Sequence, residues 1–560
     1  MDDTPWLKHY DKGVPSHIDY PQVPLFYFLE ESARKYPNSP CAIFKHAVIT
    51  YREMNELTDR LAAGLSELGL KKGDRVGIFM PNTPQFVIAY FAILKMGGVV
   101  VATNPLYKPR EIEYQVNDAG VEVMLVMSNF YNMMKELQHN TKIRTLVVTN
   151  IKEYLPPVLS FLFTLTKEKK GGFRIDLYKD DIWMKDLINR HKPEDRPKVD
   201  VGPDDMAIFQ YSGGTTGIPK GAIGLHRNLV ANALQMMNWI VNAEQGKETV
   251  LMAIPLFHVY GMVAGMCYAI CSGASMVMVP NPRDIKDVLT SITDYKTTIF
   301  PGVPTMYNAV NNHPDVKAGK YSLATVKACI SGSAPLMRET KEKFEALSGG
   351  KLVEGYGLSE APTATHCNPL YGETRTGSIG LPFPDVDSRI VSLDDGVTVL
   401  PTGEIGELVI KGPQVMKGYH NMPTETENTL RDGWLYTGDI ARMDEDGYFY
   451  IVDRKKELIK PGGYQVWPRE VEEVIMKHPK VLEVGVAGIP DPYRGETVKA
   501  WVVLKPGEMA TVDDIREWCK KELAAFKVPT EVEFRTELPK TTVGKILRRE
   551  LVREHKEKVG

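Results

Sequence analysis

Residues 74–102 read DRVGIFMPNTPQFVIAYFAILKMGGVVVA and contain two short apolar runs that flank a longer one. The short runs, Val76–Met80 and Val99–Ala102, have the length of buried strands. The longer run, about Gln85–Lys95, has the length of an apolar helix. A strand, a helix and a second strand form a parallel pair with a right-handed crossover, so this stretch predicts an α/β fold with a parallel sheet.

The same alternation continues on both sides of this stretch. Upstream, Thr50 and Glu53 form a capping box at the start of an amphipathic helix. Downstream, apolar runs recur before and after a less regular, lysine-rich stretch at about 150–200, and we therefore predict two doubly wound subdomains. The runs read as strands are Val121–Met127, Thr145–Thr149, Val250–Ile254, Ser275–Val279, Thr297–Phe300 and Val326–Ile330, with a helix at Asp284–Tyr295.

The last third of the chain differs from the rest in its composition and in its pattern of apolar residues. From about residue 373, glycine and proline are frequent and the apolar runs are short, which predicts a small β-barrel-like subdomain. A charged segment begins at Asp453, and a compact α+β pattern follows it. We expect a large N-terminal domain at 1–452 and a mobile C-terminal α+β domain at 453–560, with the hinge near Asp453. Within the large domain, the doubly wound subdomains are expected at about 1–200 and 201–372 and the β subdomain at 373–452.

The composition excludes several classes of protein. Charged residues make up 25% and hydrophobic residues 43% of the 560, which excludes a disordered chain and a collagen-like fibre. Lysine and arginine number 68 against 71 acidic residues, a net charge of −3, so we expect no nucleic acid partner. The six cysteines include one CxxxC pair, Cys267 and Cys271, with no matching histidines, which favours buried thiols in a reducing compartment.

No segment predicts a membrane-spanning helix or a secretory signal. The N-terminus is polar, the C-terminus carries no common address signal, and no apolar run reaches about 18 residues. The most apolar segment, Leu155–Leu165, is followed by Lys167, Lys169 and Lys170. A buried or lid helix is the favoured interpretation, and a helix lying at a membrane interface is the alternative. We expect a cytoplasmic protein, and we leave open both peripheral contact with the inner face of the membrane and a homodimer.

A glycine-rich loop is the strongest chemical signal in the chain. Residues 211–222 read YSGGTTGIPKGA, and the nine residues 212–220 within them combine three glycines, three hydroxyl side chains and one lysine. Glycines let backbone N–H groups approach an anion, and Lys220 adds a positive charge. A Walker A loop requires Ser or Thr after its lysine, whereas Gly221 follows Lys220, and the dinucleotide fingerprint is absent too. The sequence therefore predicts a phosphate-binding loop of another type.

Five motifs, in order, resemble those of the acyl-adenylate-forming superfamily, which includes acyl-CoA synthetases, adenylation domains of peptide synthetases and firefly-type luciferases. The loop at 211–222 is similar to the signature loop of that family. The others are EGYGLSEA at 354–361, YTGD at 436–439, DRKKELIKPGGYQVWPREVE at 453–472 and PKTTVGKILRRE at 539–550. The chain looks closest to bacterial long-chain fatty acyl-CoA synthetases. This resemblance implies that ATP activates a fatty acid as acyl-AMP, with release of pyrophosphate, and that the acyl group then passes to CoA.

The resemblance implies how the phosphates of ATP are held. Thr215, Thr216 and Lys220 would contact the β- and γ-phosphates. Glu360 would hold Mg²⁺, a hard cation that prefers oxygen ligands and phosphates.

The resemblance also implies contacts to the nucleoside of ATP. Tyr356 would stack on adenine, Asp439 would accept hydrogen bonds from the ribose hydroxyls, and Arg454 would contact the ribose from the hinge side. Ser359 stands where many relatives have threonine and retains the hydroxyl. The other positions beside the nucleotide are Gly332, Ser333, Ala334 and Gly357.

Two half-reactions sharing one site require a conformational change. By resemblance, Lys545 enters the site for adenylation and bridges the attacking carboxylate and the α-phosphate. The C-terminal domain would then rotate near Asp453, and Gly462 and Gly463 would open a passage for the pantetheine arm of CoA. The CoA thiol needs no dedicated general base against an acyl-adenylate.

The identity of the acid is the weakest inference from the sequence. His258 occupies the family's gate position near the carboxylate pocket, with a satisfied core histidine as the alternative. Gly261, Ala264 and Gly265, which follow it, would either line an apolar tunnel for a fatty acyl chain or permit close helix packing.

Other functions compete with a long-chain fatty acid–CoA ligase. A medium-chain or aryl-acid ligase differs only in its substrate, and a luciferase-like monooxygenase would emit light with a luciferin. A carrier-loading domain would need a downstream carrier, which the 560 residues do not show. A non-catalytic nucleotide or lipid sensor would not need both Lys545 and Glu360.

Overall fold

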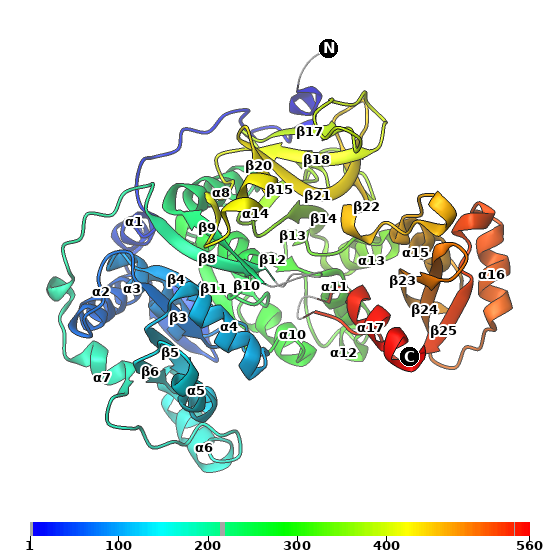
Figure 1. The fold of residues 1–560 in the computed structure, drawn as a ribbon. Helices are drawn as coiled ribbons and strands as arrows, with labels where there is room; N and C mark the ends of the chain where they lie inside the picture. Colours follow the sequence, from blue (N-terminus) through cyan, green and yellow to red (C-terminus); the bar gives the residue numbers. More distant parts are fainter. Residues whose placement is uncertain (1–3, 213–218, 542–543, 560) are drawn as a thin grey trace.

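The computed structural model describes residues 4–212, 219–541 and 544–559. Its strands form four sheets, of nine, eight, five and three strands. In Figure 1 the two large sheets and their helices make up the body, the five-stranded sheet lies at the top, and the three-stranded sheet stands apart on the right. This is the mixed α/β architecture that the sequence predicts, with a large N-terminal part and a smaller C-terminal part.

The predicted strand–helix–strand unit lies at the centre of the eight-stranded sheet. β3 (Arg75–Phe79) pairs in parallel with β4 (Val99–Ala102), and α3 (Pro84–Lys95) connects them. Every residue of α3 is buried, because this apolar helix contacts β3, β4 and also β1 (Pro40–Phe44) of the other large sheet. The strand order is β19-β9-β8-β4-β3-β5-β6-β7. The remaining strands are β5 (Val123–Met127), β6 (Thr145–Thr149), β7 (Ile182–Trp183), β8 (Met206–Ser212), β9 (Lys220–Leu225) and β19 (Gly418–Tyr419).

The nine-stranded sheet takes strands from both sides of residue 200. β1 pairs in parallel with β11, whereas β8 and β9 join the eight-stranded sheet through β4. The predicted subdomain boundary near residue 200 therefore does not coincide with the division between the sheets. The order is β16-β15-β14-β13-β12-β10-β11-β1-β2. Its other strands are β2 (Ala47–Thr50), β10 (Thr249–Met252), β11 (Ser275–Met278), β12 (Ile299–Gly302), β13 (Ala328–Ser331), β14 (Lys351–Gly357), β15 (Ala364–Cys367) and β16 (Leu381–Pro382).

The five-stranded sheet is antiparallel and open. β21 pairs with β18, β20 and β22, and β17 pairs with β18. Among the described strands, no pairing joins β17 to β20 or β22, so the barrel-like closure expected from the short apolar runs does not form. The strands are β17 (Asp387–Val391), β18 (Gly406–Lys411), β20 (Leu430–Arg431), β21 (Trp434–Met443) and β22 (Phe449–Arg454).

The C-terminal part has a sheet and hydrophobic clusters of its own. β24 pairs with β23 in antiparallel and with β25 in parallel orientation. The buried residues of this part form clusters separate from the main core of the molecule. Its elements are β23 (Val481–Asp491), β24 (Gly495–Leu504), β25 (Glu531–Arg535), α15 (Pro468–Met476), α16 (Val512–Lys520) and α17 (Arg548–Val559).

The helices of the large part cover the sheets, and several confirm the sequence patterns. α2 (Tyr51–Glu67) begins with the predicted capping box, in which the Thr50 N–H donates to Glu53 Oε2 at 2.7 Å. The other helices are α1 (Tyr27–Lys35), α4 (Pro109–Ala119), α5 (Tyr131–Leu137), α6 (Pro157–Thr166), α7 (Met184–Asn189), α8 (His226–Trp239), α9 (Tyr268–Ser272), α10 (Ile285–Asp294), α11 (Pro304–Asn312), α12 (Pro314–Lys317), α13 (Arg338–Ser348) and α14 (Pro423–Thr429). Short helical turns include η4 (Ile151–Tyr154), the π-helix η6 (Tyr260–Cys267) and η8 (Pro461–Gly463).

The helix over the most apolar segment is not buried. No residue of α6 is buried, so the expectation of a buried helix is wrong. The reason is that α6 packs against η4 at the edge of the molecule rather than between layers. Within the described residues, no helix has both the length and the apolar character needed to cross a bilayer.

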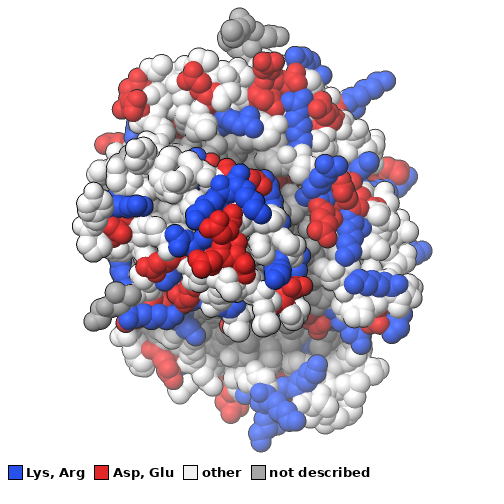
Figure 2. Space-filling model, turned by 90° about the vertical axis from the view of Figure 1, so that its right-hand side faces the viewer, with Lys and Arg blue, Asp and Glu red and all other residues white. Residues whose placement is uncertain are grey.

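Figure 2 views the face that carries the C-terminal part. Lysine and arginine side chains are interspersed with aspartate and glutamate on this face. Within the C-terminal part, Lys477 pairs with Glu522 at 2.7 Å and Lys558 with Glu533 at 2.8 Å. Basic and acidic side chains are thus mixed on this face, as they are balanced in the whole sequence.

Candidate active site

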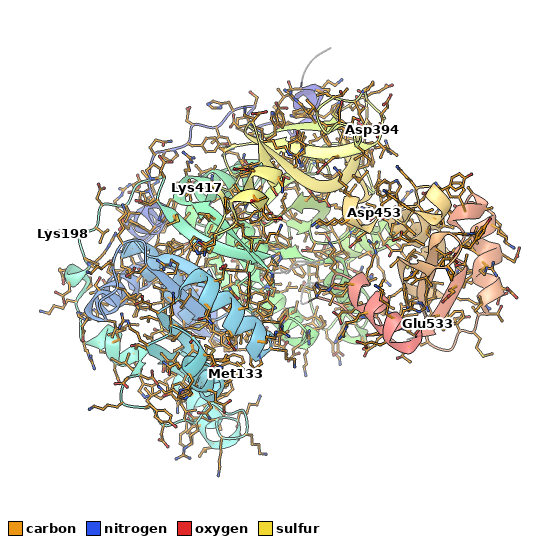
Figure 3. All side chains as sticks on the ribbon, in the orientation of Figure 1. Met133, Lys198, Asp394, Lys417, Asp453 and Glu533 are labelled. Atoms are coloured by element: carbon orange, nitrogen blue, oxygen red, sulfur yellow. The ribbon has the colours of Figure 1, made fainter. Side chains whose placement is uncertain are left out.

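The predicted motifs meet where the large part faces the C-terminal part. β9 begins with Lys220, Glu360 follows the end of β14, and Asp439 lies on β21. β22 ends at Arg454. In Figure 3 the neighbouring Asp453 lies at the junction between β22 and the C-terminal elements.

Asp439 is buried between side chains from two other motifs. Its Oδ2 accepts a hydrogen bond from the Tyr356 hydroxyl at 2.5 Å, and its Oδ1 lies 2.8 Å from Nε of Arg454. The antiparallel pairing of β21 and β22 places Asp439 directly opposite Arg454, so the backbone register sets up this ion pair. Burial and the adjacent carboxylate raise the pKa of Tyr356, which keeps its hydroxyl protonated as a donor. The residues predicted to contact the nucleoside therefore do lie together.

Lys220 and Glu360 are linked through residues that the motifs did not include. The Tyr419 hydroxyl donates to Glu360 Oε1 at 2.8 Å, and Lys220 Nζ lies 5.1 Å from the centre of the Tyr419 ring. Lys220 also forms an ion pair with Glu425 on α14. Tyr419 reaches this position because β19 pairs with β9 in antiparallel orientation. No sequence pattern pointed to Tyr419 or Glu425, because their role depends on a strand pairing between distant segments.

Thr215 and Thr216 lie outside the described residues. The structure places only the two ends of the glycine-rich loop, at β8 and β9. These strands pair in antiparallel orientation with Tyr211 opposite Gly221. The Tyr211 hydroxyl donates to Asp118 Oδ2 at 2.6 Å, which ties this strand pair to α4.

The predicted adenine loop follows β13 and is held from two sides. A Cβ on Gly332 would lie 3.1 Å from the ring of Tyr260, so glycine permits this close approach. Tyr260 in turn donates its hydroxyl to backbone carbonyls of β12 and β13. The Leu336 N–H donates to Glu354 Oε2 at 2.9 Å, and burial raises the pKa of Glu354 to about 7. The loop positioned in this way contains Gly332, Ser333 and Ala334, with Ser333 at φ 69°.

Gly357 permits the tight turn that follows β14. A Cβ at this position would lie 1.6 Å from the carbonyl oxygen of Thr363, so no other residue fits. The Leu358 N–H donates to the same carbonyl at 2.9 Å and closes the turn. Ser359 and Glu360 follow directly, so this turn determines how the chain presents the glutamate to Tyr419.

Lys545 reaches this site from the C-terminal part. Burial and the positive charge of Arg454 lower the pKa of Lys545 to about 8, against the opposing effect of Asp439. The turn that carries it also touches the large part, because a Cβ on Gly544 would lie 3.0 Å from Thr305 Oγ1 at the start of α11. Lys545 is therefore near enough to Arg454 and Asp439, two residues predicted to bind the ribose, for their charges to act on it.

Asp453, the predicted hinge residue, is bonded to the C-terminal part. Its Oδ2 accepts a hydrogen bond from the Arg469 N–H at 2.6 Å, and its Oδ1 lies 3.4 Å from Nη1 of Arg548. Arg548 also binds both carboxylate oxygens of Glu472, at 3.0 and 2.6 Å. Arg548 is the first residue of α17 and follows Lys545 by three residues, so this network holds the end of the segment that carries the lysine near Asp453.

The predicted thioester loop lies in η8 on the C-terminal part. Gly462 has φ 60°, in the left-handed region that glycine adopts without strain. Its N–H donates to the carbonyl of Arg494 at 2.9 Å. Gly463 ends the turn, and Tyr464 after it stacks on Phe526 with ring centres 4.6 Å apart.

His258 lies two residues before the π-helix η6 and is in a neutral state. Its Nδ1 accepts a hydrogen bond from the Tyr260 N–H at 3.2 Å, which leaves the proton of the neutral ring on Nε2. Burial lowers the pKa of His258 to about 4. The ring is therefore neutral at physiological pH and offers an Nε2–H donor rather than a positive charge.

The small residues after His258 serve close packing. A Cβ on Gly261 would lie 2.4 Å from the carbonyl oxygen of Pro255, and one on Gly265 would lie 2.8 Å from Cε of Met252. The space beside both glycines is occupied by protein atoms. Of the two interpretations of these glycines, the structure supports helix packing and gives no support to a tunnel at these two positions.

Comparison with known proteins identifies the family. Residues 29–420 match the family described as AMP-binding enzyme, and residues 470–545 match its C-terminal domain. The chain belongs to the AMP-binding enzyme family. The resemblance inferred from the five motifs is thereby confirmed.

Two curated relatives span this AMP-binding enzyme nearly from end to end. A long-chain-fatty-acid–CoA ligase of Bacillus subtilis is 44% identical over 99% of this chain and 98% of its own length. A 4-coumarate–CoA ligase of Solanum tuberosum is 31% identical over 97% of this chain and 94% of its own length.

Two solved structures of one protein, with and without ATP, differ in how similar they are to this chain. The ATP-bound form of MatB from Rhodopseudomonas palustris superposes with a TM-score of 0.83, at 27% identity over 95% of this chain and 99% of that one. The apo form of the same protein, 28% identical over 96% of this chain and 100% of that one, reaches only 0.73. The AMP-binding enzyme is thus more similar in structure to the ATP-bound form of MatB than to the apo form.

Proposed function

We propose that the protein is an ATP-dependent fatty acid–CoA ligase. In the first half-reaction a carboxylate oxygen of the acid attacks the α-phosphorus of ATP and pyrophosphate leaves. In the second, the sulfur of CoA attacks the acyl carbon and AMP leaves. The observation that carries the proposal is the ion pair of Arg454 with Asp439, with the buried Lys545 within electrostatic range of both, in a chain 44% identical to a long-chain-fatty-acid–CoA ligase.

We assign charge stabilisation to three basic side chains. Lys220 lies at the phosphate end of the site, and Lys545 and Arg454 lie at the ribose end near Asp439. Adenylation brings a carboxylate to a polyphosphate, so pre-positioned positive charges lower its barrier. In the free enzyme Glu425 neutralises Lys220, and the phosphates of ATP take over that role on binding.

Glu360 fits a magnesium site of the kind found with bound nucleotides. Mg²⁺ is held by one or two protein carboxylates together with substrate phosphates and water. Glu360 is a partly exposed carboxylate that accepts the Tyr419 hydrogen bond through Oε1 and not through Oε2. When bound there, the ion would neutralise phosphate charge beside Lys220.

The second half-reaction requires Lys545 to withdraw. We infer that rotation near Asp453 removes the Lys545 turn and brings Gly462 and Gly463 to the acyl-adenylate. The separate core of the C-terminal part, at 453–560, supports movement as a unit against the large domain at 1–452. The thiol of CoA, with an ordinary pKa of about 8.5, loses its proton to solvent.

A substrate panel tests the proposed function. Pyrophosphate release would be measured with ATP, Mg²⁺, CoA and acids from acetate to palmitate, together with 4-coumarate. We expect the highest kcat/KM for a long-chain fatty acid, since the fatty acid ligase is the more similar of the two relatives. A higher kcat/KM for coumarate or for acetate would overturn the fatty acid assignment, and no turnover with any acid would favour a non-catalytic sensor.

The pH dependence of adenylation follows from the lowered pKa of Lys545. Only the protonated ammonium stabilises the phosphate charge, and the pKa in the free protein is about 8. We therefore expect kcat/KM for ATP in acyl-AMP formation to fall as pH rises through about 8, approaching tenfold per pH unit. The Lys545→Arg variant should lose this decline, because a guanidinium stays protonated. An unchanged decline in that variant would assign the titration to another group.

We propose that the protein is cytoplasmic. We also propose that its small-molecule partners are ATP, CoA and a fatty acid. The acid partitions between water and bilayers, so we also propose peripheral contact with the inner face of the membrane. A homodimer stays a prediction, which light scattering at several protein concentrations would test.

A further inference from the structure

α6 exposes apolar side chains that a folded protein ordinarily buries. Val158, Phe161 and Leu165 expose 70%, 63% and 66% of their surfaces, and Leu159 and Leu162 expose 38% and 47%. A single exposed apolar residue is normal on a protein surface. Five of them within one short helix form a contiguous patch, and such patches mark contact surfaces.

The apolar residues of α6 lie on one side of the helix. Val158, Leu162 and Leu165 recur at spacings of four and three, which places them along one stripe. Phe163 points to another side, where its ring meets that of Phe173 with centres 5.3 Å apart. The helix is therefore attached to the protein through one side and presents the other to solvent.

The segment that carries α6 is anchored at its base. The Asn150 side-chain amide donates to Glu168 Oε1 at 3.2 Å and to the carbonyl of Phe173 at 3.0 Å. Lys152 pairs with Glu168 at 2.7 Å. Figure 1 shows the result, with α6 at the bottom of the molecule, beyond α5 and β6. α6 is thus a defined projection from the edge of the eight-stranded sheet.

The charge of this segment is opposite to that of the chain. Residues 151–174 contain five basic and two acidic residues, a local net charge of +3, whereas the whole chain carries −3. One of the acidic residues, Glu168, is already paired with Lys152. The exposed basic residues next to the apolar stripe are Lys167, Lys169, Lys170 and Arg174.

An apolar stripe followed by exposed lysines fits a specific kind of surface. Lipid headgroups of an anionic bilayer attract lysines, and the boundary below them accepts apolar side chains. A helix of ten residues is about 15 Å long, half the roughly 30 Å thickness of the hydrocarbon core, so it lies in the interface and does not span it.

We propose that α6 and the basic residues 167–174 dock this protein on an anionic lipid bilayer. The side chains of Val158, Phe161 and Leu165 enter the boundary between headgroups and acyl chains, and the lysines bind the headgroups. This inference specifies the surface that makes the peripheral membrane contact proposed above. Its biological role rests on the proposed function. The docking itself requires no catalysis, so the two are tested separately.

Cosedimentation with vesicles tests the docking. Wild-type protein is mixed with vesicles of phosphatidylcholine alone or of phosphatidylcholine with phosphatidylglycerol. We expect binding to the anionic vesicles and at least about tenfold weaker binding to the neutral ones. The variant F161S/L165S should lose at least about tenfold in binding to anionic vesicles, since two exposed apolar groups no longer enter the interface. K167Q/K169Q/K170Q should lose the preference for phosphatidylglycerol.

The control removes equally exposed apolar residues from elsewhere. Val397 and Met509 expose 72% and 83% of their surfaces, so V397S/M509S should bind vesicles like wild type. Acyl-AMP formation with a water-soluble acid such as hexanoate, without vesicles, should be the same in all four proteins and shows that each is folded. If wild type does not sediment with anionic vesicles, or if F161S/L165S sediments equally, the proposal is wrong. It is also wrong if light scattering shows a dimer that only F161S/L165S dissociates, since a second copy then covers α6.

Discussion

Replacement of Lys545 by alanine should lower the rate of acyl-AMP formation by about 10²–10³, the usual loss for one charge-stabilising group. Conversion of supplied acyl-AMP and CoA into thioester should stay near the wild-type rate. The physical reason is the position of Lys545 in the observed arrangement, where Arg454 and Asp439 are near enough to influence its pKa. In the mechanism proposed above, the ammonium would act on the carboxylate and α-phosphate in the first half-reaction only.

The two half-reactions can be measured separately. Pyrophosphate release reports the first, and thioester formation from synthetic acyl-AMP reports the second. Lys540→Ala is a suitable control, because Lys540 lies in the same segment but pairs with Glu483 within the C-terminal part. An equal loss in both half-reactions of Lys545→Ala would show that the lysine supports the fold or the thioester step as well.

Introducing tryptophan at Gly463 should have the opposite effect. We expect acyl-AMP formation to proceed at close to the wild-type rate and thioester formation from supplied acyl-AMP to fall by at least about 10², since misplacing a reacting group by an ångström already costs that much. In the observed arrangement η8 is bonded within the C-terminal part, through the Gly462 N–H and the carbonyl of Arg494. The bulk matters only after the domain rotates and this loop admits the thiol.

The same pair of assays checks the Gly463→Trp variant. Gly202→Trp serves as the control, because Gly202 lies in the large part. A Cβ at Gly202 would have Asp205 Oδ2, at 3.9 Å, as its nearest neighbour. Thioester formation at the wild-type rate in Gly463→Trp would exclude this loop as the route of the thiol. Loss of both half-reactions together with a lower melting temperature would show damage to the C-terminal domain, and Gly463→Ala would then be measured as the smaller change.

The local elements were predictable because their signals lie in contiguous residues. The strand at Val99–Ala102 and the strand at Thr145–Thr149 occur with the predicted bounds. The helix after Thr50 begins where its capping box indicates. Apolar runs and caps act within a few residues of one another, so tertiary packing did not need to be known.

The pairing of those elements was not predictable in the same way. β1 joins a strand of the other half of the large domain, and the five antiparallel strands stay open instead of closing into a barrel. Sequence periodicity indicates which residues of a strand are buried, but it does not indicate which distant strand lies beside it. The predicted boundary near residue 200 followed chain order, whereas the sheets do not.

The residues of the candidate site also divide into those that the sequence motifs identified and those that they did not. Family motifs singled out Lys220, Glu360, Asp439, Arg454 and Lys545, because each motif is a run of neighbouring residues. Tyr419 and Glu425 carried no such signal, because they reach Glu360 and Lys220 only through the pairing of β19 with β9.

The sequence by itself determined the parallel α/β fold, starting from residues 74–102, and the reaction class, from five motifs in order. Only the tertiary structure showed that Lys545 lies within electrostatic range of Arg454 and Asp439, because these residues come from segments that are distant in the sequence. It also decided that Leu155–Leu165 is exposed. A run of apolar residues looks the same in the sequence whether its helix is buried or exposed. Only the elements that pack around the helix in the folded protein distinguish the two cases.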